Sequence, residues 1–243
     1  QPGAFLIPGD MAIASELVEA WALDLVALTS TPASITPLHS PSMAVSGDSG
    51  VLQALDRLGF EVTPVTSYDL NQGALQGFDV FINASTSWSL LNVKGKEAFQ
   101  SWYAAGGDYL GLGRSGANLA VQSGIITAAY LQADANAIVR VDYTPGDALT
   151  AGFPVQDSAF VYYPVWFSEL GEDVVVSGSY APGDFLVSGF WPGWPDSGAA
   201  GAPAMIHTTS GDSLTALIGM DITFRVHPEN TFRLLGNAIY ASQ

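Results

Sequence analysis

Between residues 43 and 123, short apolar runs alternate with segments whose apolar residues recur at helical spacing. The runs that we predict to be strands are Met43–Ser46, Phe60–Val65, Phe78–Asn83 and Tyr109–Leu112. The helical patterns cover residues 51–58, 94–105 and 115–123. Helices of this kind are the usual crossover between parallel strands. The order therefore predicts an α/β fold, with a parallel sheet that carries helices on both faces.

After Tyr130 the helical patterns give way to short strands separated by Gly and Pro. The predicted strands are Ile138–Val141, Phe160–Tyr163, Val174–Ser177, Phe185–Phe190, Ala204–His207 and Leu214–Gly219. A last helix is predicted over Glu229–Ala241, with Phe232, Leu235 and Ile239 buried on one face. We therefore expect a β-rich insertion over about residues 138–203, before the last strand and helix.

The first 42 residues differ from the rest. A connector rich in Ser, Thr and Pro, residues 29–41, follows a predicted strand at residues 4–8 and a predicted helix at 13–28. We expect residues 1–42 to be an N-terminal extension that packs on an α/β domain spanning residues 43–243. Because the chain begins with Gln1 rather than Met, we also expect a processed or excised product.

The charge balance excludes several classes of protein. The chain has 7 Lys and Arg against 23 Asp and Glu, a net charge of −16. Nucleic-acid binders and proteins that dock on anionic lipid need many basic residues, so we expect neither partner. No apolar run reaches the roughly 18 residues of a membrane span, so we expect no membrane insertion.

The chain has no cysteine, which excludes disulfides, thiolate zinc sites and a cysteine nucleophile. Few Lys, many Gly, Ser and Thr, and no Cys suit a secreted bacterial protein. We therefore expect an extracellular location.

The most informative segment, Gly107–Ala117, runs from a strand through a glycine-rich turn into a helix. Ligands of open α/β sheets bind at the carboxyl ends of strands, where a helix N-terminus favours an anion. Arg114 is therefore a candidate to bind a carboxylate, although an ordinary surface ion pair is the simpler interpretation. Ser115 suits a capping or first-turn position of the helix.

A second segment, Gly219–Glu229, places His227-Pro228-Glu229 where the last helix is predicted to begin. Proline suits the first helical position because its missing N–H costs nothing there. The helix dipole favours a carboxylate such as Glu229 in the first turn. The motif therefore has a structural explanation that needs no catalysis.

Together the two segments resemble the class I glutamine amidotransferase-like fold, over about residues 43–131 and 204–241. The resemblance implies a flavodoxin-like open sheet, a cysteine at the elbow after the strand, and a histidine and glutamate from a His-Pro-Glu motif. His227 and Glu229 match that motif, but Gly113 stands where the cysteine belongs. Without a thiolate the acyl transfer of that family cannot run. Gly113, Ser115, His227 and Glu229 are thus candidates for a vestigial site.

The tail also resembles the C-terminal region of large secreted bacterial zinc carboxypeptidase-like proteins. The residues concerned are Phe224-Arg225-x-His227 and Thr231–Ala238. In those proteins the amidotransferase-like domain follows the peptidase domain, whose zinc site needs a His-x-x-Glu pair. None of the three histidines has a Glu at that spacing, so we expect no peptidase zinc site in this chain.

Other candidate sites leave alternatives open. Trp191 and Trp194 lie in a Pro/Gly loop that could stack on a sugar or a protein partner, or be pinned to the core by its aromatic residues. His207 and His227 could form a zinc pair or be ordinary hydrogen-bonded histidines. The sequence has no twelve-residue calcium loop. Calcium would therefore have to be coordinated by acidic residues of Gly-rich turns, namely Asp48, Asp184, Asp196 and Asp221. We predict no resident metal and no cofactor.

These observations favour a non-catalytic, amidotransferase-like accessory or interaction domain of a secreted, peptidase-related protein. Its partner would be another protein, another domain of the parent protein, or a second copy of the chain. One alternative is a hydrolase that uses Ser115 and His227. Another is a self-assembling structural protein of the extracellular space.

Overall fold

The computed structural model describes residues 40–241, so the strand and helix predicted within the N-terminal extension lie outside the described residues. The strands are β1 (Met43–Ser46), β2 (Thr63–Pro64), β3 (Val80–Asn83), β4 (Asp108–Leu112), β5 (Ala129–Gln132), β6 (Asn136–Tyr143), β7 (Gln156–Tyr162), β8 (Val165–Ser168), β9 (Val175–Tyr180), β10 (Leu186–Phe190), β11 (Pro203–Ser210) and β12 (Ser213–Ile218). The helices are α2 (Ser49–Arg57), α3 (Ser67–Asn71), α4 (Val93–Ala104), α5 (Gly113–Ser123) and α6 (Phe232–Tyr240), with 3₁₀ turns η1 (Trp88–Leu90), η2 (Ala148–Thr150), η3 (Phe224–Val226) and η4 (Glu229–Thr231).

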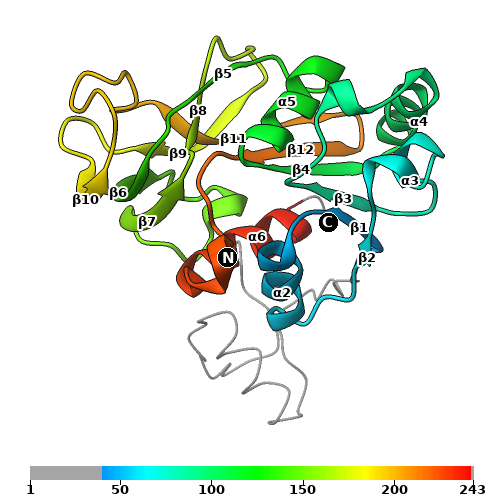
Figure 1. Ribbon diagram of the computed structural model, residues 1–243, viewed down its shortest axis with the longest axis horizontal. Coiled ribbons are helices and arrows are strands. Elements are labelled where there is room, and N and C mark those ends of the chain that lie inside the picture. The colour runs from blue at the N-terminus through cyan, green and yellow to red at the C-terminus, as the bar shows by residue number, and fades with distance from the viewer. Residues whose placement is uncertain (1–39, 242–243) are drawn as a thin grey trace, which may run out of the picture.

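Ten strands form one mixed sheet in the order β10-β6-β9-β11-β12-β4-β3-β1-β2, with β7 also paired to β6 (Figure 1). Strands β2, β1, β3, β4 and β12 are parallel, in the 2-1-3-4-5 order of flavodoxin-like folds. The hairpin between β11 and β12, closed by Gly211 and Asp212, reverses the direction. The predicted α/β fold is confirmed, and the β-rich segment extends the same sheet in antiparallel fashion.

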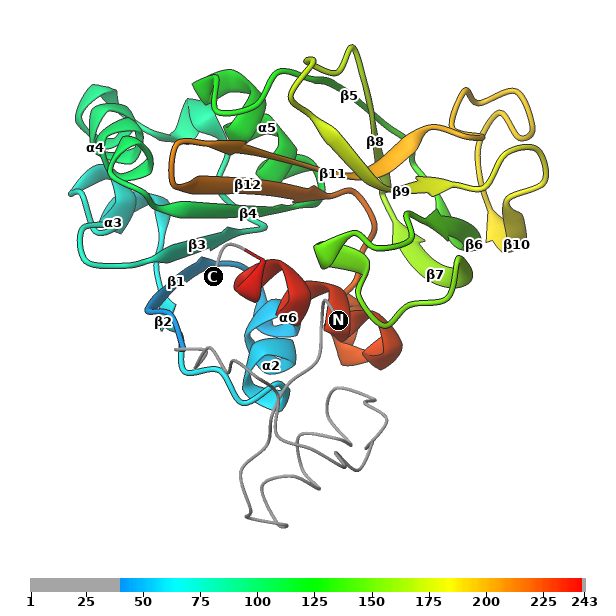
Figure 2. The same ribbon diagram turned by 180° about the vertical axis from the view of Figure 1, so that it is seen from behind.

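The parallel strands are buried on both faces because helices cover each side. Met43 and Val45 of β1 pack in one core with α2 and α6, while Ala44 between them faces the core beneath α3, α4 and α5. Figure 2 shows the same division, with α2 and α6 on one side of the sheet and α4 and α5 on the other. Strands buried in this way read as continuous apolar runs, which is why the sequence revealed them.

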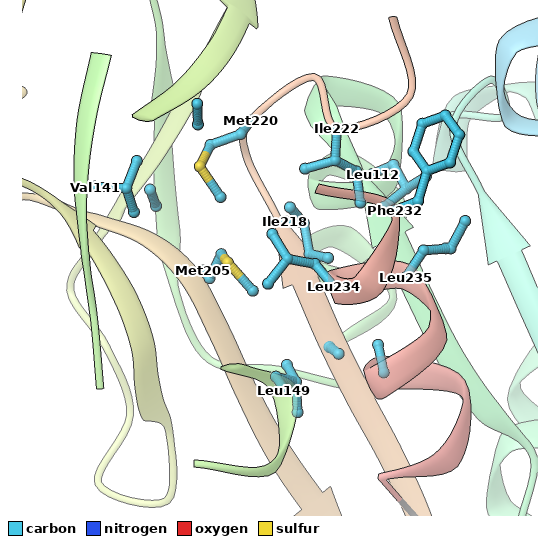
Figure 3. Packing of buried hydrophobic residues seen from close by; sticks show 14 of the residues in the cluster. Leu112, Val141, Leu149, Met205, Ile218, Met220, Ile222, Phe232, Leu234 and Leu235 are labelled. Atoms are coloured by element: carbon cyan, nitrogen blue, oxygen red, sulfur yellow. The ribbon is translucent and has the colours of Figure 1, made fainter. Parts of the chain in front are cut away.

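Helix α6 is anchored by the apolar residues that the sequence predicted. Phe232, Leu235 and Ile239 are almost fully buried, and each contributes roughly 1.5–3 kcal/mol. Figure 3 shows Phe232 and Leu234 beside Ile222, Ile218 and Leu112. The end of β12 and the entrance to α6 therefore share one packed core.

Two predicted helix starts are wrong. Helix α5 begins at Gly113, two residues before Ser115, because Gly113 adopts a φ of 55° that turns the strand directly into the helix. Helix α6 begins at Phe232, after a 3₁₀ turn. Pro228 has a ψ of 61° and is therefore not the first residue of the helix, and Glu229 lies in the 3₁₀ turn.

Some elements were shorter than predicted or were missed. The predicted strand at residues 60–65 is only Thr63–Pro64, since proline has no N–H for a ladder and is confined to sheet edges. Helix α3 was missed, although Thr66 and Asp69 form a capping box at its start. The two-stranded sheet of β5 and β8 was missed as well.

Candidate functional site

The carboxyl ends of β1, β3, β4 and β12 meet around a cavity of about 260 Å³. The residues that follow these strands and line the cavity are Asp48, Ala84, Ser85, Gly113, Arg114, Ser115 and the segment 219–223. Gln132, Tyr162 and Tyr163 close the other side. In a 2-1-3-4-5 sheet the strand order reverses between β1 and β3, and ligands bind at the carboxyl ends around that point. The cavity therefore lies where the fold favours a ligand.

The elbow between β4 and α5 is built from close backbone contacts. A Cβ atom on Gly116 would lie 2.4 Å from the carbonyl carbon of Gly111 and 2.8 Å from the carbonyl oxygen of Asn83. By contrast, a Cβ on Gly113 would have no atom within 4 Å. The elbow thus presents Gly113 to open space, at the position that the resemblance assigns to the nucleophile, and offers no side-chain atom there.

Asn83, at the end of β3, holds two walls of the cavity together. Its amide nitrogen donates to the carbonyl of Thr86 and to the hydroxyl of Tyr109, both at 2.8 Å, and its oxygen accepts from the Thr86 amide at 2.9 Å. The Tyr109 hydroxyl donates in turn to the Gly116 carbonyl at 2.9 Å. Burial raises the pKa of Tyr109, so this phenol remains a donor. The loop of Ala84 and Ser85 is therefore tied to α5.

Two carboxylates share the cavity. Asp48 caps α2, since its Oδ1 accepts from the amides of Gly50 at 2.9 Å and Val51 at 3.1 Å. Burial, together with the nearby negative charge of Asp48, raises the pKa of Asp221 to about 6. Within residues 40–241, the Asp221 carboxylate accepts no hydrogen bond. Its acceptor oxygens thus remain available to a ligand.

Beneath the lining, the loop after β12 is fixed by its apolar residues. Met220 and Ile222 are each 1% exposed and point into the core, as Figure 3 shows, while Asp221 between them faces the cavity. A Cβ on Gly219 would lie 2.1 Å from the carbonyl oxygen of Val165, so β8 approaches this loop closely. The Asp221 side chain therefore projects from a well-packed base.

Arg114 and Ser115 lie in the first turn of α5. The Arg114 side chain is exposed at the cavity and forms no ion pair within the described residues. Ser115 is half-buried and does not cap the helix, because Leu112 occupies the N-cap position. No hydrogen bond joins Ser115 to His227 in the part of the chain that the structure describes.

The His-Pro-Glu segment is not part of the cavity lining. His227 and Glu229 are exposed, and Glu229 pairs with Arg57 of α2. Thr231 holds the segment from behind by donating to the carbonyl oxygens of Ile222 at 2.9 Å and Pro228 at 2.7 Å. The structure thus brings Gly113, Arg114 and Ser115 together, but it does not add His227 and Glu229 to them.

Backbone strain is concentrated near the cavity. Of the four non-glycine residues with positive φ within residues 40–241, Tyr163 (52°) lines the cavity, while Arg225 (49°) and Val226 (63°) follow its last lining residue, Thr223. Such conformations cost about 1–3 kcal/mol each and cluster at functional sites. Sequence reasoning assigned Tyr163 to a strand and gave it no role. The available signal was the neighbouring Pro164, which has no N–H for a sheet ladder and therefore interrupts strand pairing.

The residues considered as alternative metal ligands do not come together within the described part of the chain. Asp48 and Asp221 lie at the cavity, whereas Asp184 and Asp196 are exposed in the segment around β10. Residues 40–241 contain no group of three or more His, Cys, Asp or Glu side chains that could hold a metal ion. His207 Nδ1 lies 2.9 Å from Ser177 Oγ and 3.7 Å from Asp147 Oδ2. His207 is therefore an ordinary hydrogen-bonded histidine.

The tryptophan loop is pinned to the core. Trp191 is 3% exposed and packs edge-to-face on Phe185 with ring centroids 4.8 Å apart. Trp194 is half-buried and packs on the same ring at 4.7 Å. Trp191 therefore offers no free face to a ligand, which supports the alternative that aromatic residues pin the loop to the core and contradicts a ligand-binding role for Trp191.

Among the helices of residues 40–241, none combines the length and the apolarity needed to cross a lipid bilayer.

No protein-family model matches the sequence, and no curated protein matches it either. Solved structures do share its fold. A putative ThuA-like protein from Bacteroides uniformis has a TM-score of 0.56 and 15% identity, covering 86% of this chain and 94% of that one. A glutamine amidotransferase from Thermotoga maritima has a TM-score of 0.54 and 8% identity, and the match covers 84% of this chain and 99% of that one. A β-galactosidase from a Rahnella species has a TM-score of 0.53 and 15% identity, and the match covers 82% of this chain but 31% of that one.

Proposed function

We propose that this chain is a non-catalytic, amidotransferase-like domain that serves as an accessory or interaction domain of a secreted, peptidase-related protein. The fold itself is that of the glutamine amidotransferase and ThuA-like structures. The observation that carries the proposal is the elbow, where Gly113 supplies a positive φ and no nucleophile, while His227 and Glu229 stay outside the cavity lining.

Covalent acyl transfer needs a nucleophile with a general base in hydrogen-bond reach. Ser115 lies two residues after Gly113 and lines the cavity, but no histidine hydrogen-bonds to it in the described residues. Glu229, the acidic member of the motif, is paired with Arg57 instead of orienting His227. These contacts favour a structural role for the motif.

The accessory role has independent support. The same fold accounts for about a third of the Rahnella β-galactosidase, so a domain of this shape can form part of a larger protein. The secreted and peptidase-related setting comes from the composition and from the resemblance of the tail.

Ammonia release from glutamine tests the proposal directly, and we expect none. A matched pair sharpens the test: Gly113→Cys restores a thiol at the elbow, and His227→Ala removes the imidazole. We expect iodoacetamide to alkylate the new thiol, since it faces open space, and ammonia release to remain absent. Release by the unmodified chain that disappears in His227→Ala would overturn the proposal.

Two further measurements separate the alternatives. A fluorophosphonate probe that labels Ser115, and fails to label after His227→Ala, would establish a hydrolase instead. Light scattering at several concentrations would reveal a self-assembling protein, through a mass that grows with concentration.

A further inference from the structure

The cavity at the strand ends offers hydrogen-bond acceptors and donors side by side. Asp221 and the Oδ2 atom of Asp48 are acceptors, and the guanidinium of Arg114, which has no ion-pair partner among residues 40–241, is a donor. The Ser85 and Ser115 hydroxyls, which can play either role, also line it. A ligand group that both donates and accepts, such as a hydroxyl, therefore suits this lining better than a group that does only one.

Charge argues against an ionic ligand. An anion would meet two carboxylates in a chain of net charge −16, although Arg114 and the N-terminus of α5 would attract it. A cation would meet Arg114, and residues 40–241 offer no group of three acidic or histidine side chains to bind a metal ion. The opposing charges favour a neutral ligand with several hydroxyl groups.

An aromatic surface lies at the same cavity. Tyr162 and Tyr163 line it, are 39% and 44% exposed, and pack edge-to-face with ring centroids 4.5 Å apart. Phe224 supports Tyr162 from behind at 5.2 Å. Tyr163 is held at a φ of 52°, a conformation that such a residue adopts only under constraint from its surroundings. Tyrosine rings provide rigid, amphipathic area that can cover the apolar C–H face of a ligand while the hydroxyl stays wet.

We propose that this cavity binds a carbohydrate. Asp48, Asp221 and Arg114 would bind the hydroxyl groups, and the rings of Tyr162 and Tyr163 would cover the apolar face of the sugar. The volume of about 260 Å³ lies just below the range of about 300–1,000 Å³ for drug-sized ligands, so the cavity suits a small ligand such as a single sugar unit. This inference deepens the proposed function by giving the accessory domain a ligand, and it rests on the absence of acyl-transfer chemistry at the elbow.

Saturation-transfer NMR on the full chain at pH 7 provides the test. The probes are the methyl α-glycosides of glucose, galactose, mannose and N-acetylglucosamine, together with maltose and cellobiose. We expect at least one probe to bind, with the strongest transfer at its ring C–H protons. Tyr163→Gly removes the ring and suits the positive φ, and Asp221→Asn removes the charge but keeps the shape. Each should weaken binding at least tenfold.

Matched controls change the same residue types away from the cavity. Tyr68→Ala removes a tyrosine of α3 that is 71% exposed, and Asp184→Asn removes an exposed carboxylate. Neither should alter binding. No binding by any probe, or binding that the two cavity variants leave unchanged, would overturn the inference.

Glutamine and calcium chloride serve as competing probes. If glutamine, or calcium alone, binds in a way that Asp221→Asn abolishes while no sugar binds, the site belongs to that ligand and the carbohydrate inference is wrong. The ammonia assay decides the proposed function independently. An absence of both ammonia release and sugar binding would therefore remove this inference alone.

Discussion

The elbow at Gly113–Ser115 and the segment His227–Glu229 looked like two halves of one site in the sequence, and the structure treats them differently. The elbow is clamped between buried elements, since Gly116 leaves no room for a Cβ against Gly111. His227–Glu229 instead follows a strained 3₁₀ turn and lies on the surface, where Glu229 meets Arg57. The close packing around the elbow keeps it at the cavity. The exposed His227–Glu229 segment has no such constraint and lies outside the cavity lining.

The largest effect should come from Gly116→Ala. In a helix interior, alanine is normally more favourable than glycine by about 1 kcal/mol. Here, however, the new Cβ would overlap backbone atoms that cannot move independently. We expect the free energy of unfolding to fall by about 3 kcal/mol or more. Urea denaturation measures it.

Ser115→Ala is the matched control in the same helix, and we expect a change within about 0.5 kcal/mol. If Gly116→Ala instead stabilised the chain, helix α5 and strand β4 could not be as close as described. The elbow would then not be more tightly packed than the His-Pro-Glu segment.

Asp221→Asn should change stability in a pH-dependent manner. Its pKa is about 6 in the folded chain against an ordinary 3.8, so the folded state holds the proton more tightly than the unfolded state. The wild type therefore loses stability as the pH rises from about 4 through 6. Asparagine avoids that loss, and we expect the variant to be more stable than the wild type by about 1–3 kcal/mol at pH 8, with little difference at pH 4.

Thermal melts at the two pH values give this comparison. Asp184→Asn changes an exposed carboxylate and should therefore shift the melting temperature by the same small amount at pH 4 and at pH 8. An Asp221→Asn variant that gains nothing on going to pH 8 would mean that the cavity does not hold a poorly solvated carboxylate.

Gly113→Ala should have a smaller effect, because only backbone strain opposes it. The residue has a φ of 55° and free space around its Cα, and a left-handed conformation costs a non-glycine residue roughly 1–2 kcal/mol. Gly124→Ala, at a φ of 80° and equally uncrowded at the end of α5, is the control and should lose about as much. A much larger loss at Gly113 in urea denaturation would reveal a steric contact inside the elbow.

The smallest effect should come from Glu229→Gln. Its partner Arg57 is half exposed and Glu229 more so, and exposed ion pairs contribute about 0–1 kcal/mol. A double-mutant cycle with Arg57→Gln measures the coupling. Sugar binding should not change, because neither residue lines the cavity. A loss of binding without a change in melting temperature would place the His-Pro-Glu segment in the functional site and dissolve the contrast with the elbow.

Prediction from the sequence succeeded where the signal is local. Val80–Asn83 reads as a strand because both faces are buried, so every position is apolar or, like Asn83, internally hydrogen-bonded. The helical pattern over residues 51–58 stops directly before Gly59, which has a φ of 80° after α2. Prediction failed for aromatic residues whose burial the local sequence does not specify: Trp191 is buried and Tyr163 is exposed, yet both stand next to proline in short strand-rich segments.

The sequence by itself determined the parallel strands, the helices on both faces, the glycine elbow and the absence of a thiol. These features depend on the periodicity of apolar residues and on the backbone freedom of single glycines, which act within a few residues. Only the tertiary structure decided that Tyr162 and Tyr163 line the same cavity as the elbow and that Glu229 pairs with Arg57. Both outcomes depend on how strands distant in the chain pair across the extended sheet, and the pattern of any one segment does not specify that pairing.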